Sequence, residues 1–238
     1  MITKIRFIAT IVFTTILVAC GGGGGGGGGG GVVTPVATAQ TFNLKTSYAN
    51  YLQSSSSKNI SIAGTTSGIN VTGTGTVTTG SLQTSTFQGS NALLKTTSVT
   101  STISGNGKTV PFGFSVQSYY DSNYNYLGFS GAYFLVVNSF SVLPTAAKIN
   151  DTGTLVSLSS YPSSQFTTFA NGTTTITYSL TADTETSAIF TLINVKKDTF
   201  GAIISTDTER LRITTTNAVT PLSESFFSSD GTMTVTYQ

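Results

Sequence analysis

The chain of 238 residues contains no His, no Trp and a single Cys. Without His it lacks the commonest general base and the commonest metal ligand. One Cys excludes an intramolecular disulfide and a zinc site built from thiolates. Charged residues make up 8% of the chain, against about 25% in an ordinary globular domain. We therefore predict that the protein is not an enzyme and needs no metal or cofactor.

The first twenty residues have the organisation of a secretory signal peptide. Lys4 and Arg6 form a basic start, and residues 7–19 form a mostly apolar segment without a charge. This segment is shorter than the about 20 residues that span a bilayer, but it suits the apolar region of a signal peptide. It ends in Leu17-Val18-Ala19-Cys20. An ordinary signal peptide that happens to contain a Cys is the alternative.

This ending resembles the lipobox of bacterial lipoproteins, in which a small residue directly precedes an invariant Cys. The resemblance implies removal of residues 1–19, a diacylglyceryl thioether on Cys20, and acylation of the new amino terminus by a fatty acid such as palmitate. Two or more acyl chains hold a protein firmly at a membrane. Gly21 in place of Asp after the Cys implies, by the same resemblance, the outer membrane of the cell envelope, on either side. The body resembles only uncharacterised poly-Gly lipoproteins.

Signal-peptide removal changes the charge of the chain. The precursor has 11 basic and nine acidic residues, so losing Lys4 and Arg6 leaves nine of each. No basic stripe remains that could follow a phosphate backbone, and we predict no nucleic-acid partner.

The cleaved chain should begin with a tether. Gly21–Gly31 is an unbroken run of eleven Gly, which favours a flexible coil, and we assign residues 20–40 to the lipidated Cys and this linker. Residues 41–53 are predicted to form a short helix capped by Thr41, with an apolar face that would close one end of a β core. That face consists of Leu44, Tyr48, Tyr51 and Leu52.

Short turn signals indicate β-hairpins from residue 59 onward. Asn-Gly and Asp-Gly favour two-residue hairpin turns because both turn positions need positive φ. The Asn106-Gly107 turn predicts four cross-strand pairs, which are Ile103 with Val110, Ser101 with Phe112, Val99 with Phe114, and Thr97 with Val116. The Asp230-Gly231 turn predicts Phe226 opposite Val235 and Ser228 opposite Met233. The Asn171-Gly172 turn predicts Thr167 opposite Ile176 and Gln165 opposite Tyr178.

These signals predict an all-β fold, an antiparallel meander of about 10–12 strands with one short N-terminal helix. A sandwich and an open barrel or curved sheet both fit the pattern. Nothing resembles the helical crossovers that a parallel sheet requires. We assign residues 41–238 to a single β domain, with a split near residues 89–91 as the alternative.

The carboxylates show no catalytic pattern. Asp183 with Glu185, and Asp207 with Glu209, are spaced i, i+2, so each pair shares one face of a strand. A glycosidase needs two carboxylates across a cleft, but we expect both pairs to lie on solvated strand faces. Asp121 to Asn125 resembles the start of a calcium loop, but Tyr126 stands where that loop requires Gly. We therefore expect a polar turn there and no metal site.

Aromatic residues gather in one segment, where nine lie within residues 112–134. Tyr119, Tyr120, Tyr124 and Tyr126 are interleaved with Asp, Ser and Asn, and they are the candidate partner-binding residues. Amphipathic Tyr near a loop is typical of interfaces and sugar-binding surfaces. Packing in a β core is the competing interpretation.

Together these observations predict a lipoprotein anchored to the outer membrane, with a body that is a non-catalytic binding or structural module of the cell envelope. Its partner would be an envelope protein, a glycan or a lipid. A periplasmic carrier of lipid or another hydrophobic ligand is the alternative, and a continuous apolar cavity of about 300–1,000 Å³ would favour it. A hydrolase that uses two carboxylates is the third possibility.

Overall fold

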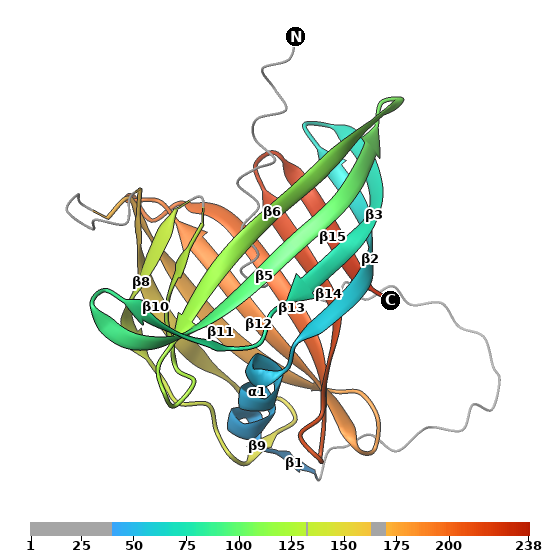
Figure 1. The fold of residues 1–238 in the computed structure, drawn as a ribbon. Helices are drawn as coiled ribbons and strands as arrows, with labels where there is room; N and C mark the ends of the chain where they lie inside the picture. The colour runs from blue at the N-terminus through green and yellow to red at the C-terminus, as the bar shows by residue number, and fades with distance from the viewer. Residues whose placement is uncertain (1–39, 132, 163–169) are drawn as a thin grey trace, which may run out of the picture.

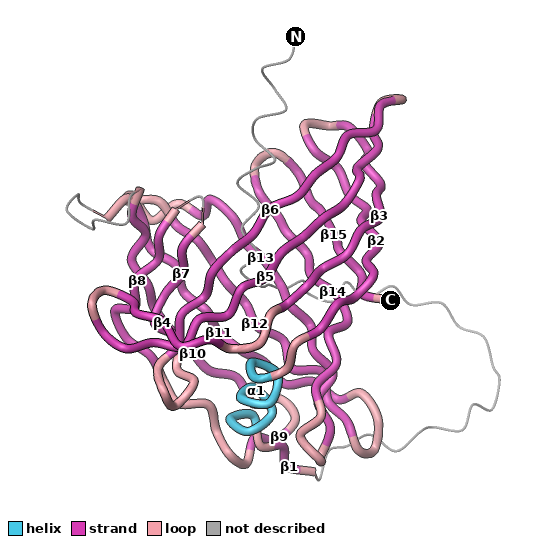
Figure 2. Tube along the Cα trace, in the orientation of Figure 1, coloured by secondary structure: helices cyan, strands magenta, loops and turns pink. Residues whose placement is uncertain are grey.

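The computed structural model describes residues 40–131, 133–162 and 170–238. Strands make up most of this part of the chain, and α1 (Leu44–Gln53) is its one α-helix (Figure 2). The N-terminal strands are β1 (Thr41–Phe42), β2 (Ser56–Thr66), β3 (Ile69–Thr79), β4 (Gln83–Phe87), β5 (Ser90–Gly105), β6 (Lys108–Tyr120), β7 (Tyr126–Ser130) and β8 (Phe134–Phe140). The C-terminal strands are β9 (Ala147–Lys148), β10 (Thr152–Tyr161), β11 (Gly172–Ala182), β12 (Ser187–Lys197), β13 (Ile203–Thr214), β14 (Val219–Ser228) and β15 (Gly231–Tyr237).

Twelve of the described strands form a closed ring. The ring strands pair in chain order from β2 to β15, all antiparallel, with β4 outside the ring on β5 and β9 outside it on β1. β15 then pairs with β2, which places Tyr237 opposite Ile60 and Val235 opposite Ile62. The all-β meander expected from the sequence is therefore present, and it closes as a barrel (Figure 1). Closure removes the exposed strand edges that an open sheet would leave.

The hairpin at Asn106-Gly107 has the predicted register. Both turn residues have positive φ, 50° and 71°, as a two-residue turn of this type requires. All four predicted pairs are present, from Ile103 with Val110 to Thr97 with Val116. Alternation along β6 then turns Val116 and Tyr120 toward the interior, and both are buried.

Two other predicted registers are wrong. Ser228 pairs with Gly231 and Phe226 with Met233, so Ser229 and Asp230 make the turn that was assigned to Asp230-Gly231. Gly231 enters β15 because it also pairs with Thr66 of β2. Asn171-Gly172 does not form a two-residue hairpin either, because Ile176 pairs with Val156. The predicted partners Gln165 and Thr167 lie outside the described residues.

The helix α1 covers one end of the barrel (Figure 1). It begins at Leu44, three residues later than predicted, because Thr41 and Phe42 pair with Lys148 and Ala147 as the small sheet β1–β9. Asn43 is the N-cap, and its side chain accepts a hydrogen bond of 2.9 Å from the Thr46 N–H. The predicted face of Leu44, Tyr48, Tyr51 and Leu52 packs against the barrel core. None of the described helical residues forms a segment long and apolar enough to cross a membrane.

The described apolar side chains inside the barrel form two clusters. The larger one lies against α1 and is built around Phe129, Leu135, Leu158, Phe190 and Leu211, all at most 1% exposed. The smaller one consists of residues from β2, β3, β5 and β15, which are Ile60, Ile62, Val71, Val77, Val99, Ile103, Met233 and Val235. A polar region with several tyrosines and glutamates lies inside the barrel next to α1.

Candidate functional site

Two glutamates face each other inside the barrel. Glu209 on β13 and Glu224 on β14 are direct cross-strand partners. The alternation of β13 places Asp207, Glu209 and Leu211 on the inner face, and these three side chains are buried, Glu209 with 4% exposure. The expectation that Asp207 and Glu209 lie on a solvated strand face is therefore wrong. The ring closes around the face that carries them.

Each glutamate accepts a hydrogen bond from a tyrosine. The Tyr51 hydroxyl, from α1, donates to Glu209 Oε1 over 2.8 Å. The Tyr237 hydroxyl, from β15, donates to Glu224 Oε1. Glu209 is thus one of the points where the helix that covers the barrel end is hydrogen-bonded to the barrel wall.

Burial and mutual repulsion shift the acid–base properties of this pair. Burial raises the pKa of Glu209 to about 7, although the hydrogen bond from Tyr51 opposes the shift. Burial, followed by repulsion from Glu209, raises the pKa of Glu224 well above its ordinary value. Two neighbouring carboxylates in a low-dielectric interior resist carrying two charges. Both shifts favour a protonated carboxyl in this pair near neutral pH.

The described lysines and arginines make no ion pair with either glutamate. Lys95 is buried, and its ammonium group donates to the carbonyl oxygens of Leu52, over 2.8 Å, and Ser54 at the end of α1. Burial lowers the pKa of Lys95 to about 8. The Lys196 ammonium lies 3.5 Å from the centroid of the Tyr133 ring, a cation–π contact. Both cations are thus engaged elsewhere, so the buried pair lacks a compensating positive charge from the described chain.

A cavity of about 100 Å³ lies beside the pair. Its lining includes both glutamates, five tyrosines (Tyr48, Tyr51, Tyr120, Tyr126 and Tyr237) and apolar residues of the barrel wall. Two polar atoms at this cavity are buried without a hydrogen-bond partner, the Tyr126 hydroxyl and Glu224 Oε2. Buried polar atoms without a partner are rare because each costs free energy.

The four candidate tyrosines do not form one exposed surface. Tyr120 and Tyr126 are 5% and 7% exposed and pack edge to face inside the barrel, with ring centroids 5.4 Å apart. Tyr119 points to the other face of β6, where its half-buried ring stacks on Phe87 at 4.5 Å. Tyr124 is half-buried with a φ of 65°. Strand alternation separates Tyr119 from Tyr120, which composition alone did not show.

The polar turn that follows β6 is held by its own side chain. Asp121 Oδ1 accepts from the backbone N–H groups of Asn123 (2.8 Å) and Asn125 (2.9 Å), and Oδ2 accepts from the Asn125 amide (2.8 Å). Asp121 thus acts as a turn-forming residue. The described residues contain no group of three or more His, Cys, Asp or Glu that could hold a metal ion.

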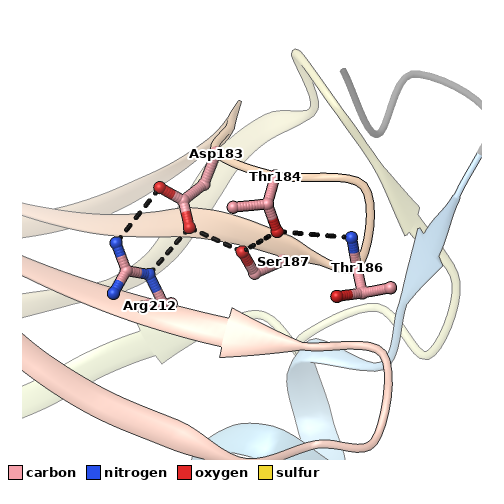
Figure 3. A network of polar contacts seen from close by, with 5 residues as sticks. All are labelled: Asp183, Thr184, Thr186, Ser187 and Arg212. Carbon is pink, nitrogen blue, oxygen red and sulfur yellow. Dashed lines mark hydrogen bonds and ion pairs between the residues drawn. The ribbon is translucent and has the colours of Figure 1, made fainter. Parts of the chain in front are cut away.

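In the other predicted acidic pair, Asp183 is half-buried and has a structural role, whereas Glu185 is exposed. Asp183 receives the Arg212 guanidinium, with 2.7 Å from Nε to Oδ2. Figure 3 shows that Ser187 also donates to Asp183, at 2.5 Å, and that Thr184 hydrogen-bonds Ser187. The hydrogen bond from Arg212 lowers the pKa of Asp183. This network joins the β11–β12 turn to β13, and Glu185 stays exposed beside it.

Exposed apolar side chains gather at the barrel end opposite α1. Phe200, 95% exposed, lies in the turn between β12 and β13, next to the exposed Ile203 and Ile204. Phe227 of β14, also exposed, lies opposite Thr206. We call these four residues the rim patch. Exposed apolar groups of this kind are typical of interaction surfaces.

The predicted lipidation residue Cys20 lies outside the described residues. In comparisons with protein-family models, curated proteins and solved structures, nothing matches this chain.

Proposed function

We propose that this chain is a lipoprotein anchored through Cys20 to the outer membrane, and that its barrel is a non-catalytic module that binds a partner in the cell envelope. The anchor rests on the lipobox resemblance of residues 17–20. The observation that carries the binding role is the packing of side chains in two clusters inside the closed barrel. The cavity beside Glu209 and Glu224 measures about 100 Å³, which is too small for a macromolecule, so such a partner would meet the outer surface.

The same observation favours a binding module over a lipid carrier. Sites for drug-sized ligands occupy about 300–1,000 Å³, several times the volume of this cavity. Polar groups also line it, including Glu209, Glu224 and Lys95. An acyl chain would fit this cavity only if core side chains moved.

The rim patch indicates a protein partner. Its side chains are large, apolar and exposed, which suits the centre of a protein interface. Because the patch is at the end opposite α1, a partner can bind there without disturbing the helix.

The anchor is tested by fractionating cells that are fed an alkyne-labelled fatty acid. We expect the wild-type protein to carry the label and to sediment with the outer membrane. Cys20→Ser should lose the label and leave either precursor or soluble protein. Label on the variant, or outer-membrane attachment by acylation without Cys20, would refute the anchor.

The binding role is tested by placing a photo-crosslinking amino acid at Phe200 in the native host. We expect a discrete crosslinked protein, and we expect Phe227→Ser to weaken the crosslink. The same crosslinker at Glu185, exposed at the opposite end, is the control. Equal products at the two positions, or none at Phe200, would contradict a partner at the rim patch.

A further inference from the structure

The cavity beside the glutamate pair has the chemistry of a cation site. Glu209 and Glu224 are adjacent in the barrel, and no described basic residue pairs with either of them. Burial and mutual repulsion favour a proton on this pair over a double negative charge. A bound cation would take the place of that proton, because it supplies the missing positive charge directly.

The lining favours an organic cation over a metal ion. Calcium takes six to eight oxygen ligands and magnesium demands an octahedral shell, whereas this cavity offers two carboxylates. The remaining wall contains five tyrosines, including Tyr120 and Tyr126. Aromatic faces attract ammonium groups through cation–π interactions, which strengthen when the cation is desolvated.

Two unsatisfied atoms define the ligand further. The Tyr126 hydroxyl and Glu224 Oε2 are buried at the cavity without a hydrogen-bond partner. A primary ammonium group carries three N–H donors, so at the pair it can donate to Glu224 Oε2 and to Glu209, while the Tyr126 hydroxyl lines the same cavity. A quaternary ammonium ion has the charge but no donor, and it would leave these atoms unpaired.

The size of the cavity limits the rest of the molecule. About 100 Å³ is well below the about 300–1,000 Å³ of sites for drug-sized ligands. A short alkylammonium ion fits this space, whereas a polyamine or a peptide does not.

We propose that the barrel cavity is a binding site for a small primary ammonium cation, held by Glu209 and Glu224 and enclosed by tyrosine rings. The site is separate from the lipid anchor and from the rim patch, so it goes beyond the proposed function. The titratable groups that face the pair are Tyr48 and Tyr51 from α1, Tyr120 from β6, Tyr126 from β7, Asp207 from β13 and Tyr237 from β15, with Lys95 of β5 also at the cavity.

Binding should strengthen as the pH rises. The cation competes with the proton that the pair holds, and burial places the pKa of Glu209 at about 7. The ligand itself stays protonated well above neutral pH, as a lysine side chain does. Affinity should therefore increase between about pH 5.5 and pH 8.5 by roughly tenfold or more.

The test is a titration of the full-length protein, in a non-ionic detergent, with methylammonium chloride at constant ionic strength. The chain has no Trp, so its intrinsic fluorescence comes from tyrosines, five of which line the cavity. We expect a saturable fluorescence change with one site per chain, confirmed by calorimetry. Tetramethylammonium and sodium chloride should produce at most a small fraction of this response.

Glu224→Gln should weaken methylammonium binding by roughly tenfold or more, since hydrogen bonds to charged groups are the stronger ones. Tyr126→Phe removes only an unpartnered hydroxyl, so it should fold as the wild type does and bind several-fold more weakly. The Tyr126→Phe variant therefore tests the site even if Glu224→Gln fails to fold. Glu185→Gln, at an exposed carboxylate, should bind like the wild type.

Three results would overturn the site. The first is the absence of saturable methylammonium binding to the wild-type protein. The second is equal binding of sodium or tetramethylammonium. The third is a folded Tyr126→Phe variant, together with a folded Glu224→Gln variant where one is obtained, that binds as the wild type does. None of these results bears on acylation of Cys20 or on crosslinking at Phe200.

Discussion

Glu209 and Glu224 are cross-strand neighbours on the inner wall of the barrel, each hydrogen-bonded by a tyrosine from a different element. Glu209 accepts from Tyr51 of α1, whereas Glu224 accepts from Tyr237 of the last strand. The pair therefore connects the N-terminal helix to the strand that closes the ring. The protonation of the pair should affect the stability of the whole fold.

We predict that stability decreases as the pH rises through the titration of Glu209. Its pKa is about 7 in the folded chain, against an ordinary value of 4.5. Because the pKa of Glu209 is raised in the folded chain, the stabilising contribution of this residue is complete below pH 4.5. It is lost as the pH rises through about 7. The loss is on the order of 3 kcal/mol. Urea unfolding across this range should show it, and Glu209→Gln should show a smaller dependence on pH.

The control for this prediction is Glu185→Gln. Glu185 is exposed, so this variant should retain the pH dependence of the wild type. Equal pH dependence in Glu209→Gln and the wild type would show that the buried pair does not titrate in this range.

We predict losses of stability of different size for substitutions at two nearby tyrosines. Tyr126→Ser empties part of the barrel core and should cost about 3–5 kcal/mol. Tyr119→Ser removes a half-buried ring that stacks on Phe87, and it should cost about 1 kcal/mol. Denaturant unfolding of the two variants measures the difference. Similar losses for both would mean that the burial of Tyr126 contributes little.

Gly75→Ala should destabilise the barrel. A Cβ at Gly75 would collide with the backbone carbonyl of Thr100 on the neighbouring strand, so β3 and β5 would have to separate there. Gly80→Ala is the matched control, since the nearest atom to a Cβ there is Thr96 O at 3.8 Å. We expect a loss of more than about 1 kcal/mol for Gly75→Ala only. The measurement is the thermal unfolding midpoint of each variant, compared with that of the wild type.

The ion pair between Asp183 and Arg212 should contribute little to stability. Arg212 is 45% exposed, so Arg212→Ala should cost less than about 1 kcal/mol. The pKa of Asp183 is lowered chiefly by the hydrogen bond from Arg212. The stabilisation by this ion pair is therefore present above the ordinary carboxyl pKa range, and it is lost as the pH falls through the lowered pKa of Asp183. NMR titration should show the pKa of Asp183 rising in Arg212→Ala. An unchanged pKa would mean that the contact in Figure 3 does not persist in solution.

Local sequence determined the elements whose geometry is set within a few residues. Asn106-Gly107 established the register of its hairpin, because few residues other than Asn and Gly accept positive φ at both turn positions. The apolar spacing of α1 likewise identified the face that packs on the core. The i, i+2 spacing of Asp207 and Glu209 showed that they share a face, which was the signal that could have revealed the site.

Tertiary structure decided whether the face shared by Asp207 and Glu209 points into the barrel or into solvent. Glu209 meets Glu224 because the consecutive strands β13 and β14 pair. The two lie inside a barrel because β15 returns to pair with β2, and no local pattern specifies that contact between strands so distant in the chain. The same closure moved the last turn to Ser229-Asp230, since Gly231 pairs with Thr66. Thr41 failed as a helix cap because β1 pairs with β9. Strand alternation is a local property, but only the closed ring distinguishes inside from outside.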